Sequence, residues 1–146
     1  MLRIIYKTSI YSYPYVGNDN SFSGQIASFV GNRSVMVCTD KMIPAGFFIT
    51  DFDGIYNIWH THATIAVGQS ELVTDKFEPS KYKVNDFLYC SENGKVSNES
   101  RYRGNIIVGL VNSFTPTEIG FITMFARGLE NPITPVSSCA NDKRSI

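Results

Sequence analysis

The chain has 146 residues, a length that suits one domain and is too short for two independent hydrophobic cores. Hydrophobic residues make up 43% of the chain and charged residues 18%, a composition that excludes a wholly disordered protein. Thirteen basic residues balance thirteen acidic ones, so there is no electrostatic reason to expect nucleic acid or an anionic membrane as a partner.

Residues 1–20 combine aromatic rings with turn-forming residues and lack a regular apolar period. Tyr11, Tyr13 and Tyr15 alternate along this segment, so an extended backbone would place their rings on one side. We interpret residues 1–20 as an extended N-terminal arm that binds a partner through these tyrosines. The alternative is an edge strand within the chain's own sheet, where Pro14 would be tolerated.

Residues 21–127 contain short runs of β-branched and aromatic residues between turn formers, and no long segment has apolar residues at helical spacing. With one run in the N-terminal segment, the expected strands are Leu2–Tyr6, Gln25–Val30, Ser34–Thr39, Phe47–Thr50, Ile55–Thr61, Thr64–Val67, Asp86–Cys90, Asn105–Asn112 and Ile119–Phe125. Asp53-Gly54 and Asn93-Gly94 are dipeptides typical of tight hairpin turns. The pattern predicts an all-β, single-domain sandwich or small barrel.

The C-terminal half contains the most continuously apolar strands, which are typical of a protein core. We expect deep burial of Phe87, Leu88, Ile107, Val108, Leu110, Ile122 and Met124. Beyond this domain, Pro132 and Pro135 disfavour both helix and sheet, so residues 128–146 are expected to form an irregular C-terminal tail. No stretch reaches the 18 or more apolar residues of a membrane helix, and no signal peptide is expected.

His60 and His62 are the strongest indication of catalysis, because residues two apart on a strand share a face and could bind one metal ion. A catalytic zinc site needs a third protein ligand, and no motif supplies it. Asp51 and Asp53 provide only the start of a cation-binding loop and are better explained by turn formation. We therefore expect no metal, no other cofactor and no enzymatic activity.

Cys38, Cys90 and Cys139 are odd in number and far apart, which favours reduced thiols in a protein made in a reducing cytoplasm. A nucleophilic Cys38 or Cys90 would need a histidine base and an orienting group. Both lie in apolar runs, where a buried and unreactive thiol is the usual case.

The stretch Lys83–Phe125 resembles the core of phage head decoration proteins of the lambda type and of other small phage structural β-domains. The likeness consists of the strand Asp86–Tyr89, the turn Asn93-Gly94-Lys95, the polar loop Ser97–Arg103, the apolar run Ile107–Val111, a short Ser/Thr/Pro break and the strand Gly120–Phe125. It covers about a third of the chain.

The resemblance implies a virion structural protein, a decoration or cement protein that is made in the host cytoplasm and sits on the capsid exterior. Such a protein would form a homotrimer and bind between subunits of the major capsid protein, with Tyr11, Tyr13, Tyr15 and Trp59 as candidate partner-binding residues. Two alternatives stay open. One is another virion role, as a tail, connector or spike protein, and the other is a β-sandwich carbohydrate-binding module with Trp59 and Tyr56 as stacking rings.

Overall fold

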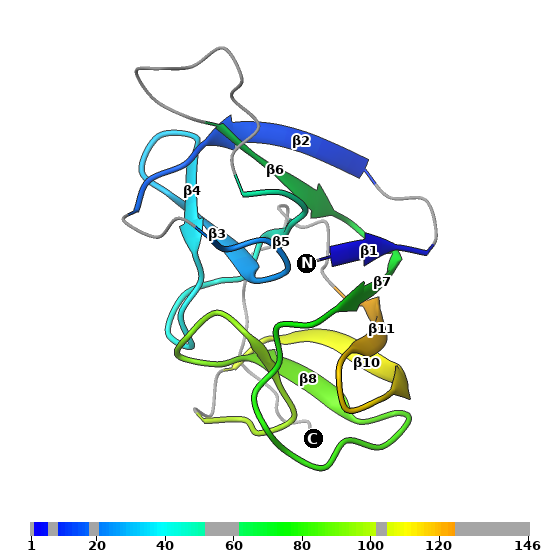
Figure 1. Cartoon of the computed structure of the whole chain (residues 1–146). Helices are drawn as coiled ribbons and strands as arrows, with labels where there is room; N and C mark the ends of the chain where they lie inside the picture. Colours follow the sequence, from blue (N-terminus) through cyan, green and yellow to red (C-terminus); the bar gives the residue numbers. More distant parts are fainter. Residues whose placement is uncertain (1, 6–8, 18–20, 52–61, 102–104, 125–146) are drawn as a thin grey trace.

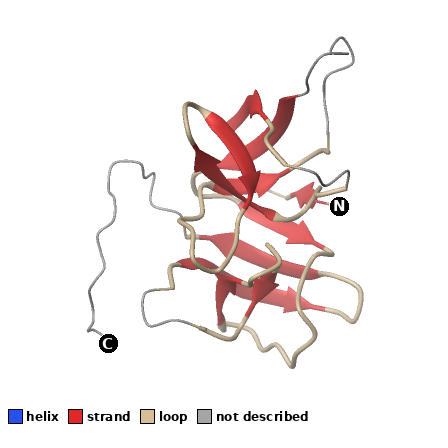
Figure 2. Cartoon of the chain, turned by 90° about the vertical axis from the view of Figure 1, so that its left-hand side faces the viewer, coloured by secondary structure: helices blue, strands red, loops and turns tan. Residues whose placement is uncertain are grey.

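The computed structural model describes residues 2–5, 9–17, 21–51, 62–101 and 105–124. Every regular element in these ranges is a β-strand, and the strands form two antiparallel sheets (Figure 2). This confirms the predicted all-β sandwich. The described ranges hold no helix of the length and apolarity that crossing a membrane requires.

The larger sheet has six strands in the order β1-β7-β11-β10-β8-β9 (Figure 1). Their bounds are β1 Leu2–Ile4, β7 Glu71–Thr74, β11 Ile119–Thr123, β10 Ile107–Phe114, β8 Phe87–Cys90 and β9 Val96–Ser97. The Asn93-Gly94 turn joins β8 to β9 as predicted, and Gly94 has the positive φ of 78° that such a turn requires.

The smaller sheet has five strands in the order β2-β6-β5-β3-β4. Their bounds are β2 Ser9–Pro14, β6 His62–Val67, β5 Gly46–Phe48, β3 Ile26–Val30 and β4 Ser34–Val37. The two edges of this sheet approach each other, because Tyr15 forms a parallel bridge with Val35 and the Val16 N–H donates to the Val35 carbonyl at 2.8 Å. The sheet therefore curls into a small, barrel-like half of the sandwich.

The described residues form two apolar clusters, one on each side of the curled sheet. The sandwich core lies between the sheets and includes Ile26, Phe47, Ala66, Leu72, Leu88, Val108, Val111, Ile119 and Phe121. The curl core lies inside the five-stranded sheet and consists of Phe22, Ala27, Val35, Phe48, Ala63 and Ile65. Period-two alternation explains both clusters, since successive residues of a strand point to opposite faces.

The described N-terminal residues include two edge strands, β1 and β2, as the alternative interpretation of this segment predicts. β1 pairs with β7, and β2 pairs along its whole length with β6. Pro14 ends β2 at the edge of its sheet, where a missing backbone donor costs little. The β domain therefore includes β1 and β2, whereas residues 128–146 lie outside the described ranges.

The prediction of the core was partly wrong about which face of each strand is buried. Leu88 and Val108 are fully buried, but Phe87, Ile122 and Met124 point outward and are 48%, 45% and 43% exposed. Ile107 and Leu110 are half-buried. In β10, the irregular register between Ile107 and Gly109 shifts the pattern, so that Val108 and Val111 both face the core. β11 alternates regularly, and the face that it buries carries Phe121 rather than Ile122.

Most of the observed strands lie where the sequence predicted a strand, whereas three observed strands were not predicted. β2, β7 and β9 were not among the expected strands. The predicted strand Ile55–Thr61 and the predicted Asp53-Gly54 turn lie outside the described residues.

Candidate functional site

Of the three tyrosines that the sequence predicted to bind a partner, Tyr11 and Tyr13 lie on β2 and Tyr15 follows directly after its end, on the same side of the extended chain. That side faces the interior of the curled sheet, because Tyr11 is opposite Ile65 and Tyr13 is opposite Ala63. The Tyr15 ring stacks on Phe22 with 4.1 Å between ring centroids. Tyr15 is therefore part of the protein's own packing.

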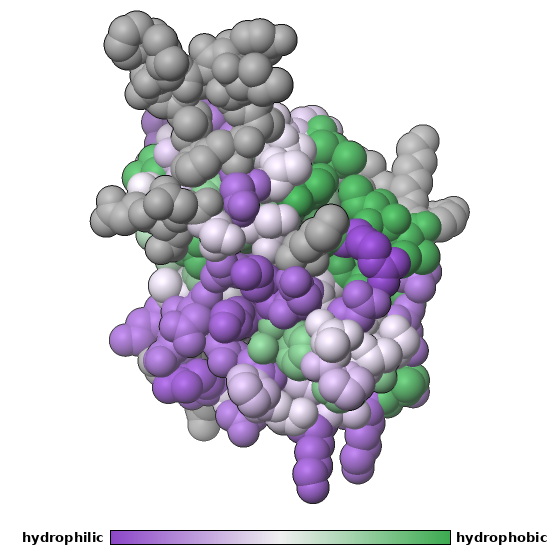
Figure 3. Space-filling model, viewed as in Figure 1, coloured by the Kyte–Doolittle hydropathy of each residue, from purple (hydrophilic) through white to green (hydrophobic). Residues whose placement is uncertain are grey.

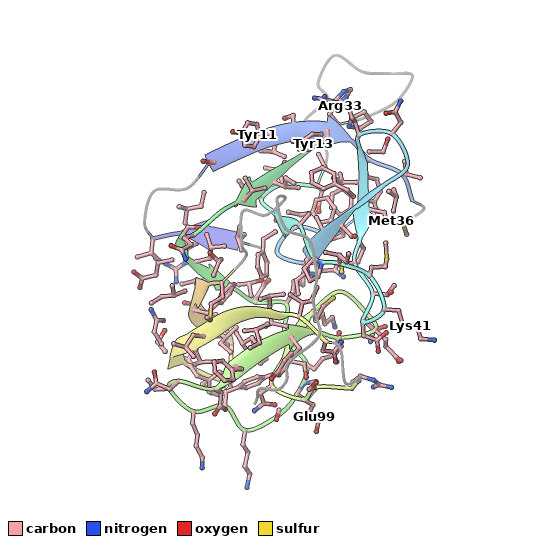
Figure 4. All side chains as sticks on the ribbon, turned by 180° about the vertical axis from the view of Figure 1, so that it is seen from behind. Tyr11, Tyr13, Arg33, Met36, Lys41 and Glu99 are labelled. Atoms are coloured by element: carbon pink, nitrogen blue, oxygen red, sulfur yellow. The ribbon has the colours of Figure 1, made fainter. Side chains whose placement is uncertain are left out.

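Tyr11 and Tyr13 lie further along β2, towards solvent (Figure 4). The centroid of the Tyr13 ring lies 6.4 Å from the centroid of the Tyr11 ring. It lies 4.9 Å from the centroid of the Phe29 ring, which it meets edge-on. Tyr11 is 52% exposed and Phe29 is 39% exposed. We call Tyr11, Tyr13 and Phe29 the aromatic surface.

Arg33 lies in the turn of the hairpin that also carries Phe29. Its side chain is exposed, and its backbone has a φ of 64°, a conformation that few residues other than glycine adopt. Tyr and Arg are enriched among the residues that contribute most binding energy in protein interfaces. The aromatic surface and its neighbouring turn therefore have the composition of a binding site.

Sequence reasoning missed Phe29 and Arg33 as candidate site residues. The strand that contains Phe29 was predicted, but its contact with Tyr13 forms only because the sheet curls and brings β2 near β4. That closure joins residues that are distant in sequence, so local patterns do not reveal it.

The remaining predicted binding residue, Trp59, lies outside the described residues, as do Tyr56 and His60. His62 is half-buried in β6, where it pairs with Pro14. Within the described ranges, no group of three or more His, Cys, Asp and Glu residues is arranged to hold a metal ion.

Cys38 and Cys90 are both buried, and the Cys90 thiol donates to the carbonyl oxygen of Cys38 at 3.5 Å. A hydrogen bond with Cys90 and the burial of the group raise the pKa of the Cys38 thiol far above its ordinary value. The neutral thiol is therefore the stable form of Cys38, and a neutral thiol is a poor nucleophile.

Asp51 has a structural role through a distant segment of the chain, which the turn interpretation did not foresee. Its Oδ1 atom accepts hydrogen bonds from the backbone N–H groups of Phe22 and Ser23, both at 2.6 Å. These bonds hold the segment that places Phe22 in the curl core. Asp53 lies outside the described residues.

A polar hollow of about 210 Å³ lies beside the β8–β9 turn. In it, Glu78 Oε2 accepts hydrogen bonds from Ser91 Oγ at 2.6 Å and from Asn93 Nδ2 at 3.2 Å. Arg101 on its rim pairs with Asp40 at 3.2 Å. Small-molecule pockets are mostly apolar, whereas this hollow is polar and its groups bind one another, so they support the turn.

Comparisons with known proteins add no family. No protein-family model matches the chain, and a search of curated proteins finds no match. The resemblance of Lys83–Phe125 to decoration proteins therefore stays a prediction, and the candidate site is defined by its geometry.

Proposed function

We propose that the protein is a virion structural protein that acts by binding, as a decoration or cement protein that attaches to neighbouring subunits of a capsid shell. The observation that carries this proposal is the aromatic surface of Tyr11, Tyr13 and Phe29. The resemblance of Lys83–Phe125 to such proteins supplies the kind of partner, the major capsid protein.

The aromatic surface suits attachment because it is built on paired strands. Tyr13 is held between Tyr11 and Phe29, so its ring loses little conformational freedom when a partner binds. Rigid aromatic rings provide a large contact area at low entropic cost. A ligand that binds only the assembled shell stabilises that shell by mass action, without any chemical step.

Another virion role, in a tail, connector or spike, would use the same surface and differs only in the position of the chain in the particle. A carbohydrate-binding module is less well supported. The Tyr13 ring is inclined by 45° to Tyr11 and by 88° to Phe29, so the three rings of the aromatic surface do not form one flat platform. Trp59 and Tyr56, the other candidate stacking rings, lie outside the described residues.

Particles purified from the native source provide the test. We expect quantitative mass spectrometry to find this chain in a constant ratio to the major capsid protein, and immunogold labelling to place it over the head. Absence of the chain from the particles would refute a virion role. Labelling confined to a tail or a vertex would refute the decoration role and favour the other virion roles.

The binding surface is tested by adding the purified chain to particles assembled without it and measuring co-sedimentation. We expect the double variant Tyr11→Ala, Phe29→Ala to lose most of its binding. Val84→Ala, a substitution at an exposed apolar residue outside the aromatic surface, should bind like the unaltered chain. Equal binding of the double variant and the unaltered chain would show that the aromatic surface is not the contact.

A further inference from the structure

Cys38 and Cys90 come from different sheets and meet inside the sandwich core. Cys38 follows β4 of the five-stranded sheet, and Cys90 ends β8 of the six-stranded sheet. Both side chains are buried members of the sandwich core. The two thiols form a hydrogen bond with each other, and the Cys90 thiol also lies 3.5 Å from the Cys38 carbonyl oxygen. Two buried thiols that are far apart in the chain are therefore in contact.

Backbone hydrogen bonds hold the two cysteines in this position. The Cys38 N–H donates to the Ile26 carbonyl at 2.8 Å, and the Ile26 N–H donates to the Gly94 carbonyl, also at 2.8 Å. Ile26 thus links the residue after β4 to the β8–β9 turn. Cys90 pairs with Val96 in the ladder of β8 and β9, which places it beside the same turn. The thiols therefore meet within a hydrogen-bonded backbone that belongs to both sheets.

Polar residues cover the junction that contains the two cysteines. Arg101 forms ion pairs with Asp40 at 3.2 Å and with Glu92 at 3.6 Å, so it bridges the loop after β4 and the β8–β9 turn. Figure 3 shows hydrophilic residues on the left of the view, where this loop lies beside this turn. Dissolved oxidants and reductants therefore have little access to the thiols while the chain is folded.

We propose that Cys38 and Cys90 are a redox-sensitive pair, which forms a disulfide bond between the two sheets when the chain folds in an oxidising medium. A disulfide forms only between cysteines whose side chains meet, as these two do. The bond closes the long loop from Cys38 to Cys90, and a disulfide that closes a long loop stabilises the fold by restricting the unfolded chain. A chain that folds in a reducing cytoplasm keeps both thiols and lacks this stabilisation.

The oxidant in this reaction is a small disulfide such as glutathione disulfide. The thiolate of one cysteine attacks it, one glutathione leaves, and a mixed disulfide remains on the chain. The thiolate of the second cysteine then attacks the cysteine sulfur of the mixed disulfide and displaces the second glutathione. The two thiol protons end on the two glutathione thiols, so two cysteines are oxidised as one glutathione disulfide is reduced. Because burial disfavours the thiolate, the bond forms while the sheets assemble rather than in the folded chain.

Oxidative refolding of the full chain, followed by a peptide map, tests the pair and needs no partner of the proposed function. The reduced, unfolded chain is refolded with glutathione disulfide, the remaining thiols are blocked with N-ethylmaleimide, and the product is cleaved with trypsin. Cleavage after Lys and Arg places Cys38, Cys90 and Cys139 in the separate peptides 34–41, 84–95 and 128–143. We expect mass spectrometry to find the first two peptides linked in most of the product.

The effect on stability is measured by urea denaturation of the variant Cys139→Ser, which removes the third thiol. We expect the midpoint of its oxidised form to lie about 1 M urea or more above that of its reduced form. The matched control is the triple variant Cys38→Ala, Cys90→Ala, Cys139→Ser. It has no thiol, so its midpoint should be the same in the two media.

Three results would overturn the proposal. The first is a refolded chain in which the peptides 34–41 and 84–95 both carry N-ethylmaleimide or glutathione. The second is a main link that includes the Cys139 peptide. The third is an oxidised Cys139→Ser chain whose midpoint does not exceed that of its reduced form, which would show that the sheets hold the two sulfur atoms apart. The peptide map uses the unaltered chain, so it gives its answer even if the triple variant does not fold.

Discussion

At the scale of single residues, Gly94 shows how closely the two sheets approach each other. Its φ of 78° is accompanied by close contact, since a Cβ atom there would lie 2.3 Å from Val37 Cγ1 and 3.0 Å from the Cys38 carbonyl oxygen. The Gly94 carbonyl also accepts a hydrogen bond from the Ile26 N–H at 2.8 Å. The β8–β9 turn is therefore packed directly against strands of the other sheet.

We predict that Gly94→Ala lowers the free energy of unfolding by about 2–4 kcal/mol, from backbone strain and overpacking together. Gly31→Ala separates the two causes, because Gly31 has a φ of 56° and a Cβ atom added there would meet no other atom within 4 Å. It should cost only about 1–2 kcal/mol. Urea denaturation measures both changes, and equal losses at the two sites would contradict the predicted contact.

Tyr82 gives the molecule a predicted sensitivity to alkaline pH. Burial, with the carboxylates of Glu78 and Glu99 adding to it, raises the pKa of the Tyr82 hydroxyl to about 12. Because this folded value lies above the unfolded value of about 10, the stabilisation is complete below pH 10 and is lost as the pH rises towards 12. The unaltered chain should therefore lose stability across this window more steeply than Tyr82→Phe. Parallel curves of unfolding free energy against pH would contradict the prediction.

At the scale of the strands, the neighbours Phe121 and Ile122 on β11 provide a test of which face is buried. Phe121 is fully buried in the sandwich core, whereas Ile122 points outward. We predict a loss of about 3–5 kcal/mol for Phe121→Ala. Ile122→Ala should cost less than about 1 kcal/mol in the monomer. Urea denaturation at a protein concentration low enough to keep the chain monomeric measures both, and a larger loss for Ile122→Ala would reverse the assignment of faces.

The strands could be predicted from sequence more reliably than their faces. The predicted strands Gln25–Val30 and Ser34–Thr39 match β3 and β4, because β-branched and aromatic residues there lie between turn formers. The faces of β10 were misjudged because its irregular register depends on β8 and β11, which the local sequence does not contain.

The candidate site could be predicted only in part. The alternation of Tyr11 and Tyr13 indicated a shared side, and the structure confirms it. Their contact with Phe29 depends on the closure of the curled sheet through Tyr15 and Val35, a pairing between residues far apart in the chain. Non-local pairing of this kind leaves no periodic signal in a single sequence.

At the scale of the whole molecule, the two apolar clusters are joined by the strands that they share. On β3, Ile26 points into the sandwich core and Ala27 into the curl core. On β5, Phe47 and Phe48 divide in the same way. Neither cluster can lose its packing without disturbing β3 and β5, so we expect both to unfold together as one cooperative unit.

We predict a single unfolding transition that substitutions in either cluster shift as a whole. Tyr15→Ala removes the ring stacked on Phe22 in the curl core, and Phe121→Ala opens the sandwich core. In both variants, far-ultraviolet circular dichroism, which reports the sheets, and near-ultraviolet circular dichroism, which reports aromatic packing, should give the same midpoint at one protein concentration. If Tyr15→Ala lost its aromatic signal at a lower denaturant concentration than its sheet signal, the curl core would be an independent unit, because only separate units unfold at separate midpoints.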